Sequence, residues 1–349
     1  MRTVAALVWA TALLVAPTTL HTSPALASTP SQFVFSNPIA LADDGQHLWV
    51  ANNIGGSVVE IAVSSGKIVR ILQGPSYGFN SIRRLVLGAG ALWVLNSGND
   101  TITEVNVSTG AVIRIIQGSP ETLNGVTDFV LYGGHLWVAN SAELSAYPPS
   151  VSAVNVATGA VDFVGSSPSY QLDQPGALVV EHGHLWVANP ANGLMSEIDL
   201  KTKLVIRVVA AESNHSYGGA PTALLAEGRH VWVANSDGEV TEFDATNGRR
   251  LREIRGSAYG LSNPVALAKD GKYLWVANND GYSLTKIRLS DGALIALIKG
   301  APNSSRYASY GIQPRAFALD SRYLWIASDF NAIAELNRSS GQIAAFIPH

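Results

Sequence analysis

Four side chains that could hold a ligand recur at one point of an internal repeat in this sequence. Arg84, Asp128, Thr222 and Arg315 each stand where an apolar segment begins after a loop. Two guanidinium groups, a carboxylate and a hydroxyl that converge on one place could hold a carboxylate, a phosphate or sugar hydroxyls. The alternative is that these side chains are solvated and cap a water-filled channel.

Histidine gives a weaker chemical signal. We place His215, in 213-SNHSYGG-219, in a loop near those four side chains, and no partner stands at metal-binding spacing from it. Four more histidines precede a repeated tryptophan: His47, His135, His184 and His230. Other copies carry Tyr273 or Tyr323 at that position. Because a tyrosine replaces them so freely, a structural role is favoured for these four histidines.

Common catalytic and metal-binding motifs are missing from the chain. It contains no cysteine, and it lacks the G-x-S-x-G, H-E-x-x-H, P-loop, EF-hand and C-x-x-C patterns. A Ser-His-Asp set assembled by the fold stays open. The sequence therefore predicts no metal site and no cofactor, and it favours binding over catalysis. The alternative is a lyase or hydrolase whose site draws on Arg84, Asp128, His215 and Arg315.

The elements that position these side chains are marked by a five-residue motif that occurs seven times. It reads 48-LWVAN-52 in the first copy and 324-LWIAS-328 in the last. Its tryptophans are Trp49, Trp93, Trp137, Trp186, Trp232, Trp275 and Trp325, spaced 43 to 50 residues apart. A period in this range indicates a propeller or a solenoid.

Each repeat contains four short apolar strands separated by turns. In the sixth copy they are 264-PVALAKDG, 272-KYLWVAN, 282-YSLTKIRLSDG and 294-LIALIKG. The third strand commonly ends in a Ser/Thr-x-Gly turn, such as 64-SSG-66, where glycine permits the positive φ of a tight hairpin. Four antiparallel strands, seven copies and no helical periodicity predict an all-β, seven-bladed propeller. We expect each blade to be contiguous in sequence, with the circle closed by packing of the seventh blade on the first.

Three recurring side chains accompany the strands. The tryptophans are predicted to be architectural, filling the gap between neighbouring blades. A structural role is also favoured for the asparagines that end the second strands: Asn52, Asn96, Asn140, Asn189, Asn235 and Asn278. The loops that enter the first strands carry Tyr77, Tyr170, Tyr217, Tyr259 and Tyr310. These tyrosines suit a surface that binds protein or glycan, or alternatively each packs on its own blade and bonds a neighbouring loop.

Charge and the N-terminal segment limit the partners. Residues 1–27 predict a signal peptide, with Arg2, an apolar run over 4–15 and the cleavage pattern 25-ALA-27. Residues 28–349 then form one domain, exported to the envelope or the medium, as is ordinary for a bacterial protein without cysteine. The formal net charge is −3 and no basic run exceeds two residues, so binding to nucleic acid has no visible basis. No segment is long enough to span a bilayer, and a monomer is expected.

The repeat resembles a known family of secreted propellers. Over residues 33–349 the repeat unit resembles the YVTN-type repeat. Its patterns, in order, are LWVAN, V-x-E-I/V, a T/S-G turn and V-x-R-I-x-G. The pattern is also similar to the broader group of virginiamycin-B-lyase-like propellers, in which glutamate ends the second strand and histidine follows proline in places. Here asparagine replaces that glutamate, and no histidine follows Pro38 or its counterparts. The resemblance implies the propeller architecture without the catalytic residues of the lyase. The faithful repeat and the missing catalytic motifs favour a rigid scaffold that binds a protein, glycan or small molecule on its channel face.

Overall fold

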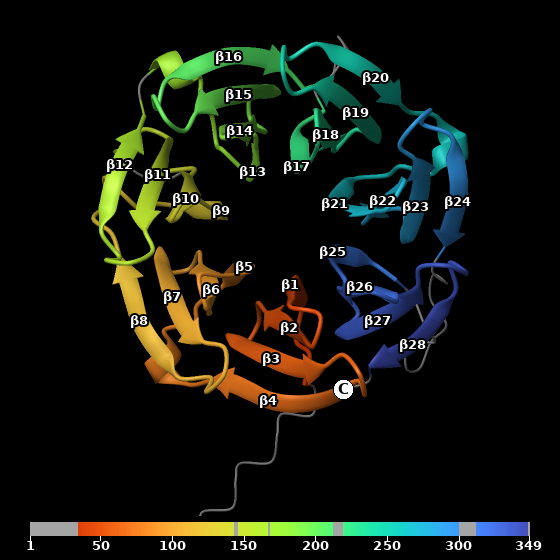
Figure 1. Cartoon of the computed structure of the whole chain (residues 1–349), viewed down its shortest axis with the longest axis horizontal. Helices are drawn as coiled ribbons and strands as arrows, with labels where there is room; N and C mark the ends of the chain where they lie inside the picture. Colours follow the sequence, from red (N-terminus) through yellow and green to blue (C-terminus); the bar gives the residue numbers. More distant parts are fainter. Residues whose placement is uncertain (1–33, 143–145, 167, 212–218, 300–311, 348–349) are drawn as a thin grey trace, which may run out of the picture. The chain divides into compact units, whose positions relative to one another are not determined.

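The architecture is a ring of small antiparallel sheets (Figure 1). The computed structural model describes residues 34–142, 146–166, 168–211, 219–299 and 312–347. Within the compact unit Phe35–His349, these residues form seven four-stranded sheets, which confirms the predicted seven-bladed propeller. No helix in this part of the chain is long and apolar enough to cross a membrane.

Each blade uses four consecutive strands. The first strands are β1 (Pro38–Asp43), β5 (Ile82–Gly88), β9 (Val126–Tyr132), β13 (Ala177–Glu181), β17 (Pro221–Glu227), β21 (Pro264–Asp270) and β25 (Pro314–Leu319). The second strands are β2 (His47–Asn52), β6 (Ala91–Asn96), β10 (His135–Asn140), β14 (His184–Asn189), β18 (His230–Asn235), β22 (Tyr273–Asn278) and β26 (Tyr323–Ser328). The third strands are β3 (Ser57–Ala62), β7 (Thr101–Asn106), β11 (Ser150–Asn155), β15 (Leu194–Asp199), β19 (Glu239–Asp244), β23 (Ser283–Arg288) and β27 (Ala332–Asn337). The fourth strands are β4 (Lys67–Gln73), β8 (Val112–Gln117), β12 (Val161–Gly165), β16 (Val205–Ala210), β20 (Arg250–Ile254), β24 (Leu294–Lys299) and β28 (Ile343–Ile347).

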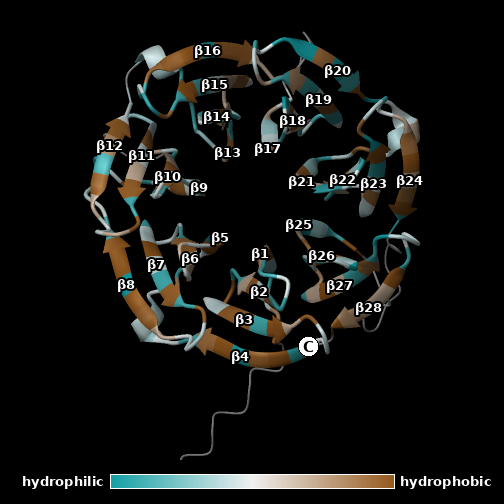
Figure 2. Ribbon diagram, in the orientation of Figure 1, coloured by the Kyte–Doolittle hydropathy of each residue, from teal (hydrophilic) through white to brown (hydrophobic). Residues whose placement is uncertain are grey.

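The strands of each blade pair in chain order, with the first strand nearest the centre and the fourth at the rim (Figure 1). In blade 7, β28 pairs with β27, and β1 packs against β25 and β26. The predictions of contiguous blades and of closure by packing are therefore confirmed. The rim itself is apolar, as the colouring of β8, β16 and β24 in Figure 2 shows, and isoleucines such as Ile113 lie exposed there.

The second strands are buried on both faces because each blade lies between two others. Leu48, Trp49, Val50 and Ala51 have no exposed surface. All seven repeated tryptophans are at most 4% exposed, so their predicted architectural role agrees with their burial. Removing such a side chain from a core costs about 3 to 5 kcal/mol, and the tryptophans therefore account for a large share of the cohesion between blades.

The strand-end asparagines are bonded inside the blade. Asn96 is fully buried, and its side-chain amide donates to the hydroxyl groups of Thr101 and Thr103 on the third strand. Asn140 and Asn278 make the same pair of bonds in their blades. Buried amides need such partners because an unsatisfied one is costly. These contacts support the structural interpretation of the asparagines.

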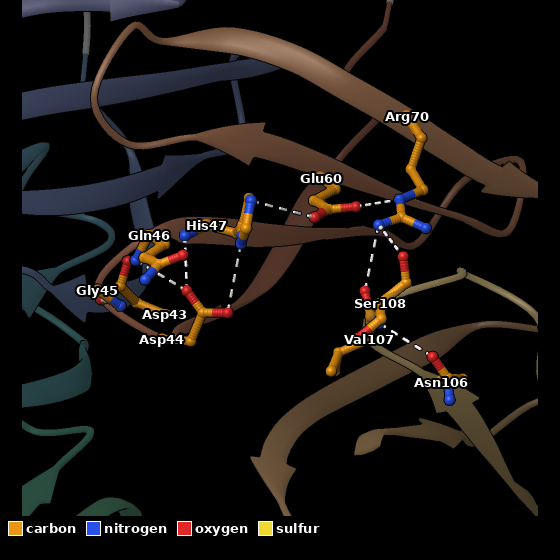
Figure 3. Close-up of polar contacts among 10 residues, drawn as sticks. All are labelled: Asp43, Asp44, Gly45, Gln46, His47, Glu60, Arg70, Asn106, Val107 and Ser108. Carbon is orange, nitrogen blue, oxygen red and sulfur yellow. Dashed lines mark hydrogen bonds and ion pairs between the residues drawn. The ribbon is translucent and has the colours of Figure 1, made fainter. Parts of the chain in front are cut away.

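A second polar device joins neighbouring blades at the outer strands. Glu60 on β3 pairs with Arg70 on β4, and the Arg70 guanidinium donates to the carbonyl oxygens of Val107 and Ser108 in the next blade, at 3.2 and 3.1 Å (Figure 3). His47 lies on the other side of Glu60, at 3.7 Å. The guanidinium carbon also lies 5.9 Å from the centroid of the Trp49 ring. We call this Glu–Arg–carbonyl arrangement the latch.

The latch recurs in three further blades. The pairs are Glu104–Arg114, Glu197–Arg207 and Glu242–Arg252, each with bonds from the arginine to carbonyls of the following blade. At two junctions between blades, other side chains replace the glutamate or the arginine of the latch. Blade 3 has Phe163 at the arginine position, with Lys203 of blade 4 over its ring at 4.8 Å. In blade 6, Lys286 stands at the glutamate position and donates to the Arg338 carbonyl of blade 7 at 3.1 Å.

Candidate functional site

The first strands of all seven blades surround a central cavity of about 410 Å³. Each first strand contributes up to three residues to its wall. Apolar residues such as Ile39, Leu41 and Leu85 stand beside polar ones, but polar atoms make up more of the surface that faces the cavity. The polar side chains are three arginines, one aspartate and two threonines. The predicted residues Arg84, Asp128, Thr222 and Arg315 all line this cavity.

These four residues occupy two different positions of the repeat. Most first strands begin with a bulge, and Thr222 and Arg315 are the bulged residues of their strands, skipped in the pairing with the second strand. Arg84 and Asp128 instead pair with Leu95 and with Ala139, one position further along. From the sequence, all four residues were predicted to occupy the same position of the repeat. Proline precedes the bulge in blades 1, 5, 6 and 7, and its absence from blades 2 and 3 hid the shift by one residue.

The same correction reveals a residue that the sequence analysis missed. Arg83 is the bulged residue of β5, it is exposed, and it lines the cavity. It forms no ion pair with any residue that the structure describes. The signal was present in the sequence as two adjacent arginines, Arg83 and Arg84.

Arg84 and Asp128 form an ion pair between blades 2 and 3, at 3.3 Å from Nε to Oδ1. The second carboxylate oxygen accepts a hydrogen bond from the Leu178 N–H of blade 4, at 2.8 Å. Burial raises the pKa of Asp128, against the opposing effects of Arg84 and of the Leu178 N–H. Asp128 is thus a buried group that joins three blades, while half of the Arg84 side chain stays exposed.

Arg315 and Thr222 also have partners. Nε of Arg315 lies 2.7 Å from both carboxylate oxygens of Asp329. The Thr222 hydroxyl donates to the carbonyl oxygen of Ala234 at 3.0 Å and also to that of Pro264 in the next blade. Thr222 therefore lies at the cavity, but its hydroxyl proton is already donated to backbone carbonyl oxygens.

Of the remaining candidates, His215, Tyr217 and Tyr310 lie outside the described residues. The other three tyrosines are half-buried, and their hydroxyl groups donate to carbonyl oxygens of the following blade: Tyr77 to Gly110, Tyr170 to Lys203 and Tyr259 to Gly292. These contacts match the structural alternative for the tyrosines.

The histidines that precede the tryptophans pair with acids. His184 accompanies Glu197, His230 accompanies Glu242 and His135 accompanies Asp162. No group of three or more histidine and acidic side chains among the described residues could hold a metal ion. The chemistry available at the cavity is therefore that of guanidinium groups on a largely polar wall, which suits recognition of an anion.

Comparison with known proteins supports the fold only. No protein-family model and no curated protein matches the sequence. The crystal structure of the computationally designed protein Ika8 is similar, with a TM-score of 0.62 and 14% identity over 91% of this chain and 89% of that chain. At that identity, the likeness shows a shared propeller architecture.

Proposed function

We propose that this protein is an exported, non-catalytic binding scaffold whose central cavity takes a small molecule with a carboxylate or phosphate group. The observation that carries the proposal is Arg83, an exposed cation at the cavity wall without an ion-pair partner among the described residues. Its charge acts on Asp128 only through space, and a ligand anion would supply a directly bonded partner. The signal peptide expected over residues 1–27 supports export.

The two other arginines add donors to the same site. Arg84 and Arg315 meet their carboxylate partners through Nε, so their terminal nitrogens are available for a ligand. Their side chains are 51% and 41% exposed. A guanidinium offers five N–H donors in a fixed plane, and one carboxylate uses two of them. The three arginines together can therefore hold an anion while two of them keep their contacts with the protein.

The wall and the cavity volume limit the rest of the ligand. A cavity of about 410 Å³ lies within the range of ordinary small-molecule sites, roughly 300 to 1,000 Å³. Leu224, Leu267 and Phe317 are half-buried on its wall, but most of the surface that faces the cavity is polar, so an anionic ligand that also carries hydroxyl groups fits as well as an apolar one. A ring of packed blades is formed before binding, which keeps the entropy cost of ordering low.

The test is a thermal-shift and calorimetric screen of the purified protein against aromatic and aliphatic carboxylates, phosphate esters, neutral sugars and divalent cations. A ligand present at 100 times its Kd should stabilise the protein by about 2.7 kcal/mol. We expect binding by a carboxylate or phosphate ester that Arg83→Ala abolishes. Arg249→Ala is the matched control, since it removes the same charge from an exposed turn.

Three results would contradict the proposal: binding of neutral sugars only, binding of cations only, or anion binding that Arg83→Ala leaves intact. The lyase or hydrolase alternative has its own readout. It predicts that a bound ligand is converted to product, and that Arg84→Ala or Arg315→Ala stops the conversion.

A further inference from the structure

The junction between blade 7 and blade 1 holds a second pocket, of about 930 Å³. It lies away from the central cavity, among the turns that join first to second and third to fourth strands. Its wall includes Glu335, Asp320 and Ala345 of blade 7, and Ser64 and Gly66 of blade 1. The charged side chains on this wall are Glu335, Asp320, Arg322 and, when protonated, His47.

Strand register shows that this pocket is the latch position of the last blade without its arginine. In blades 1, 2, 4 and 5 the latch glutamate pairs across the strands with arginine, as Glu60 does with Arg70. In blade 7 the equivalent partner of Glu335 is Ala345. Trp325 lies beside Glu335 on the next strand, as Trp49 lies beside Glu60. The junction therefore retains the glutamate and the tryptophan and lacks only the cation.

The turn glycines locate the missing group. At the first latched junction, a methyl group added to Gly110 would meet a guanidinium nitrogen of Arg70 at 2.8 Å. At Gly66, the equivalent glycine of blade 1, the same methyl group would meet a carboxylate oxygen of Glu335 at 3.9 Å. The space beside this turn is thus filled by a guanidinium in one junction and faced by a bare carboxylate in the other.

Glu335 differs from the latched glutamates in its electrostatics as well. Its side chain has no hydrogen-bond or ion-pair partner among the described residues, and it is half-buried. Burial raises the pKa of Glu335, and the nearby Asp320 carboxylate raises it further. A cation beside Glu335 would relieve both effects.

We propose that this pocket binds a guanidinium group, presented by a small molecule or by an arginine side chain of a partner. The Glu335 carboxylate would take two N–H donors. The carbonyl oxygens of Val63 and Ser64, which correspond to the acceptors Val107 and Ser108 of the first latch, would take others. The four occupied latches of the same chain are the template for this mode of binding, and the site is independent of the central cavity.

Calorimetry with Nα-acetyl-arginine amide tests the proposal. The citrulline analogue is the neutral probe of the same shape. The lysine analogue is a cation that lacks the planar array of guanidinium N–H donors. We expect the arginine compound to bind and the citrulline compound not to bind. Glu335→Gln should weaken binding at least tenfold. The tripeptide Gly-Arg-Gly and agmatine distinguish the two sources of the guanidinium group. If the natural ligand is an arginine side chain of a protein partner, the peptide should bind more tightly. If it is a free metabolite, agmatine should bind more tightly.

Variants at Ala345 and Gln342 give the sharpest control. Ala345→Arg places a guanidinium from the chain itself beside Glu335 and should abolish binding. Gln342→Arg adds the same side chain to the exposed turn before β28, where blade 5 carries the exposed Arg249, and should leave binding intact. Arg322→Ala removes the exposed cation on the wall and should leave binding unchanged or tighter. Equal binding of the citrulline probe, or unaltered binding by Ala345→Arg, would overturn the proposal.

Discussion

The junction between blades 1 and 2 and the junction between blades 7 and 1 are built from the same repeat, yet only the first is latched. In the first, Arg70 spans from Glu60 to two carbonyl oxygens of the next blade. In the second, Glu335 faces a pocket. The chain also continues from blade 1 into blade 2, whereas no connection runs from blade 7 to blade 1. The closing junction thus lacks both the covalent link and the latch.

This difference teaches that burial of apolar side chains closes the ring and that the latches add to it. β1 packs on β25 and β26, and the Asn331 side chain accepts a hydrogen bond from the Asn37 N–H at 2.7 Å. Those contacts suffice to hold the last blade. A position freed from latching can take another role, which is the basis for the guanidinium pocket.

The largest effect is expected from the tryptophans. Trp49→Ala and Trp325→Ala should each destabilise the protein by about 3 to 5 kcal/mol, because each leaves a cavity in the core. The loss should be larger for Trp325 by about 1 kcal/mol. Its Nε1 donates to the buried Asp320 carboxylate at 2.7 Å, whereas Trp49 Nε1 has no partner among the described residues and only the Arg70 guanidinium lies over its ring. Urea unfolding measures both values. Equal losses would show that the bond to Asp320 adds no more stability than the Arg70 contact.

A somewhat smaller loss is expected from breaking a latch. Arg70→Ala leaves Glu60, which is 1% exposed, with only the more distant His47, and should cost about 3 kcal/mol. Glu335→Gln at the closing junction is the comparison. It removes an unpaired carboxylate and should be neutral or slightly stabilising. A destabilisation of similar size in both variants would contradict the distinction between the two junctions.

The third prediction concerns pH at the closing junction. Burial raises the pKa of Asp43 from 3.8 to about 6, against a hydrogen bond from the Gly45 N–H, and Asp320 of blade 7 raises it further. Because the folded state then holds the proton more tightly than the unfolded state, stability falls as the pH rises from about 4 to above 6.

Asp43→Asn removes this titration. The variant should be more stable than the wild type by about 1 to 2 kcal/mol at pH 8, after allowance for solvent screening of a partly exposed group. The gain should vanish below pH 4. Thermal unfolding across this pH range measures it. Asp44→Asn is the control, because its effect on stability should have the opposite sign. Burial alone would raise the pKa of Asp44, but hydrogen bonds from the His47 and Gln46 N–H groups lower this pKa overall.

The smallest effect is expected from adding the missing latch. Ala345→Arg should stabilise the closing junction by about 1 kcal/mol, since the new ion pair is partly exposed and costs side-chain entropy. Gln342→Arg, in the exposed turn before β28, should change the free energy of unfolding by less than about 0.5 kcal/mol. If both variants behave alike, the Glu335 carboxylate is not positioned as the latched glutamates are.

Much of the architecture was predictable because it depends on local patterns. The spacing of the tryptophans, the alternation within each strand and the glycine turns are all short-range features, and they gave the number of blades and of strands per blade correctly. The register of β5 and β9 was harder. Ile82 and Val126 stand where other blades have proline, so nothing in the sequence marked the bulge, and Arg83 was missed.

The candidate site could be predicted only in part. Arg84, Asp128, Thr222 and Arg315 all line the central cavity, because the repeat places the starts of the first strands around one axis. Their role in binding a ligand stays a prediction. Their partners were not predictable. The pairing of Arg84 with Asp128, and the bond from Leu178 to the same carboxylate, join residues up to 50 positions apart, and no local pattern reports them.

The sequence by itself determined a seven-fold ring of four-stranded blades around a core of tryptophans, because a repeat of apolar residues with period two can bury its surface only against copies of itself. The tertiary structure alone decided which charges meet. It pairs the arginines of four blades with neighbouring turns, leaves Arg83 open to the central cavity, and places Glu335 opposite Ala345. Ion pairs depend on distances of a few ångströms between side chains far apart in the chain, and such distances exist only once the blades have packed.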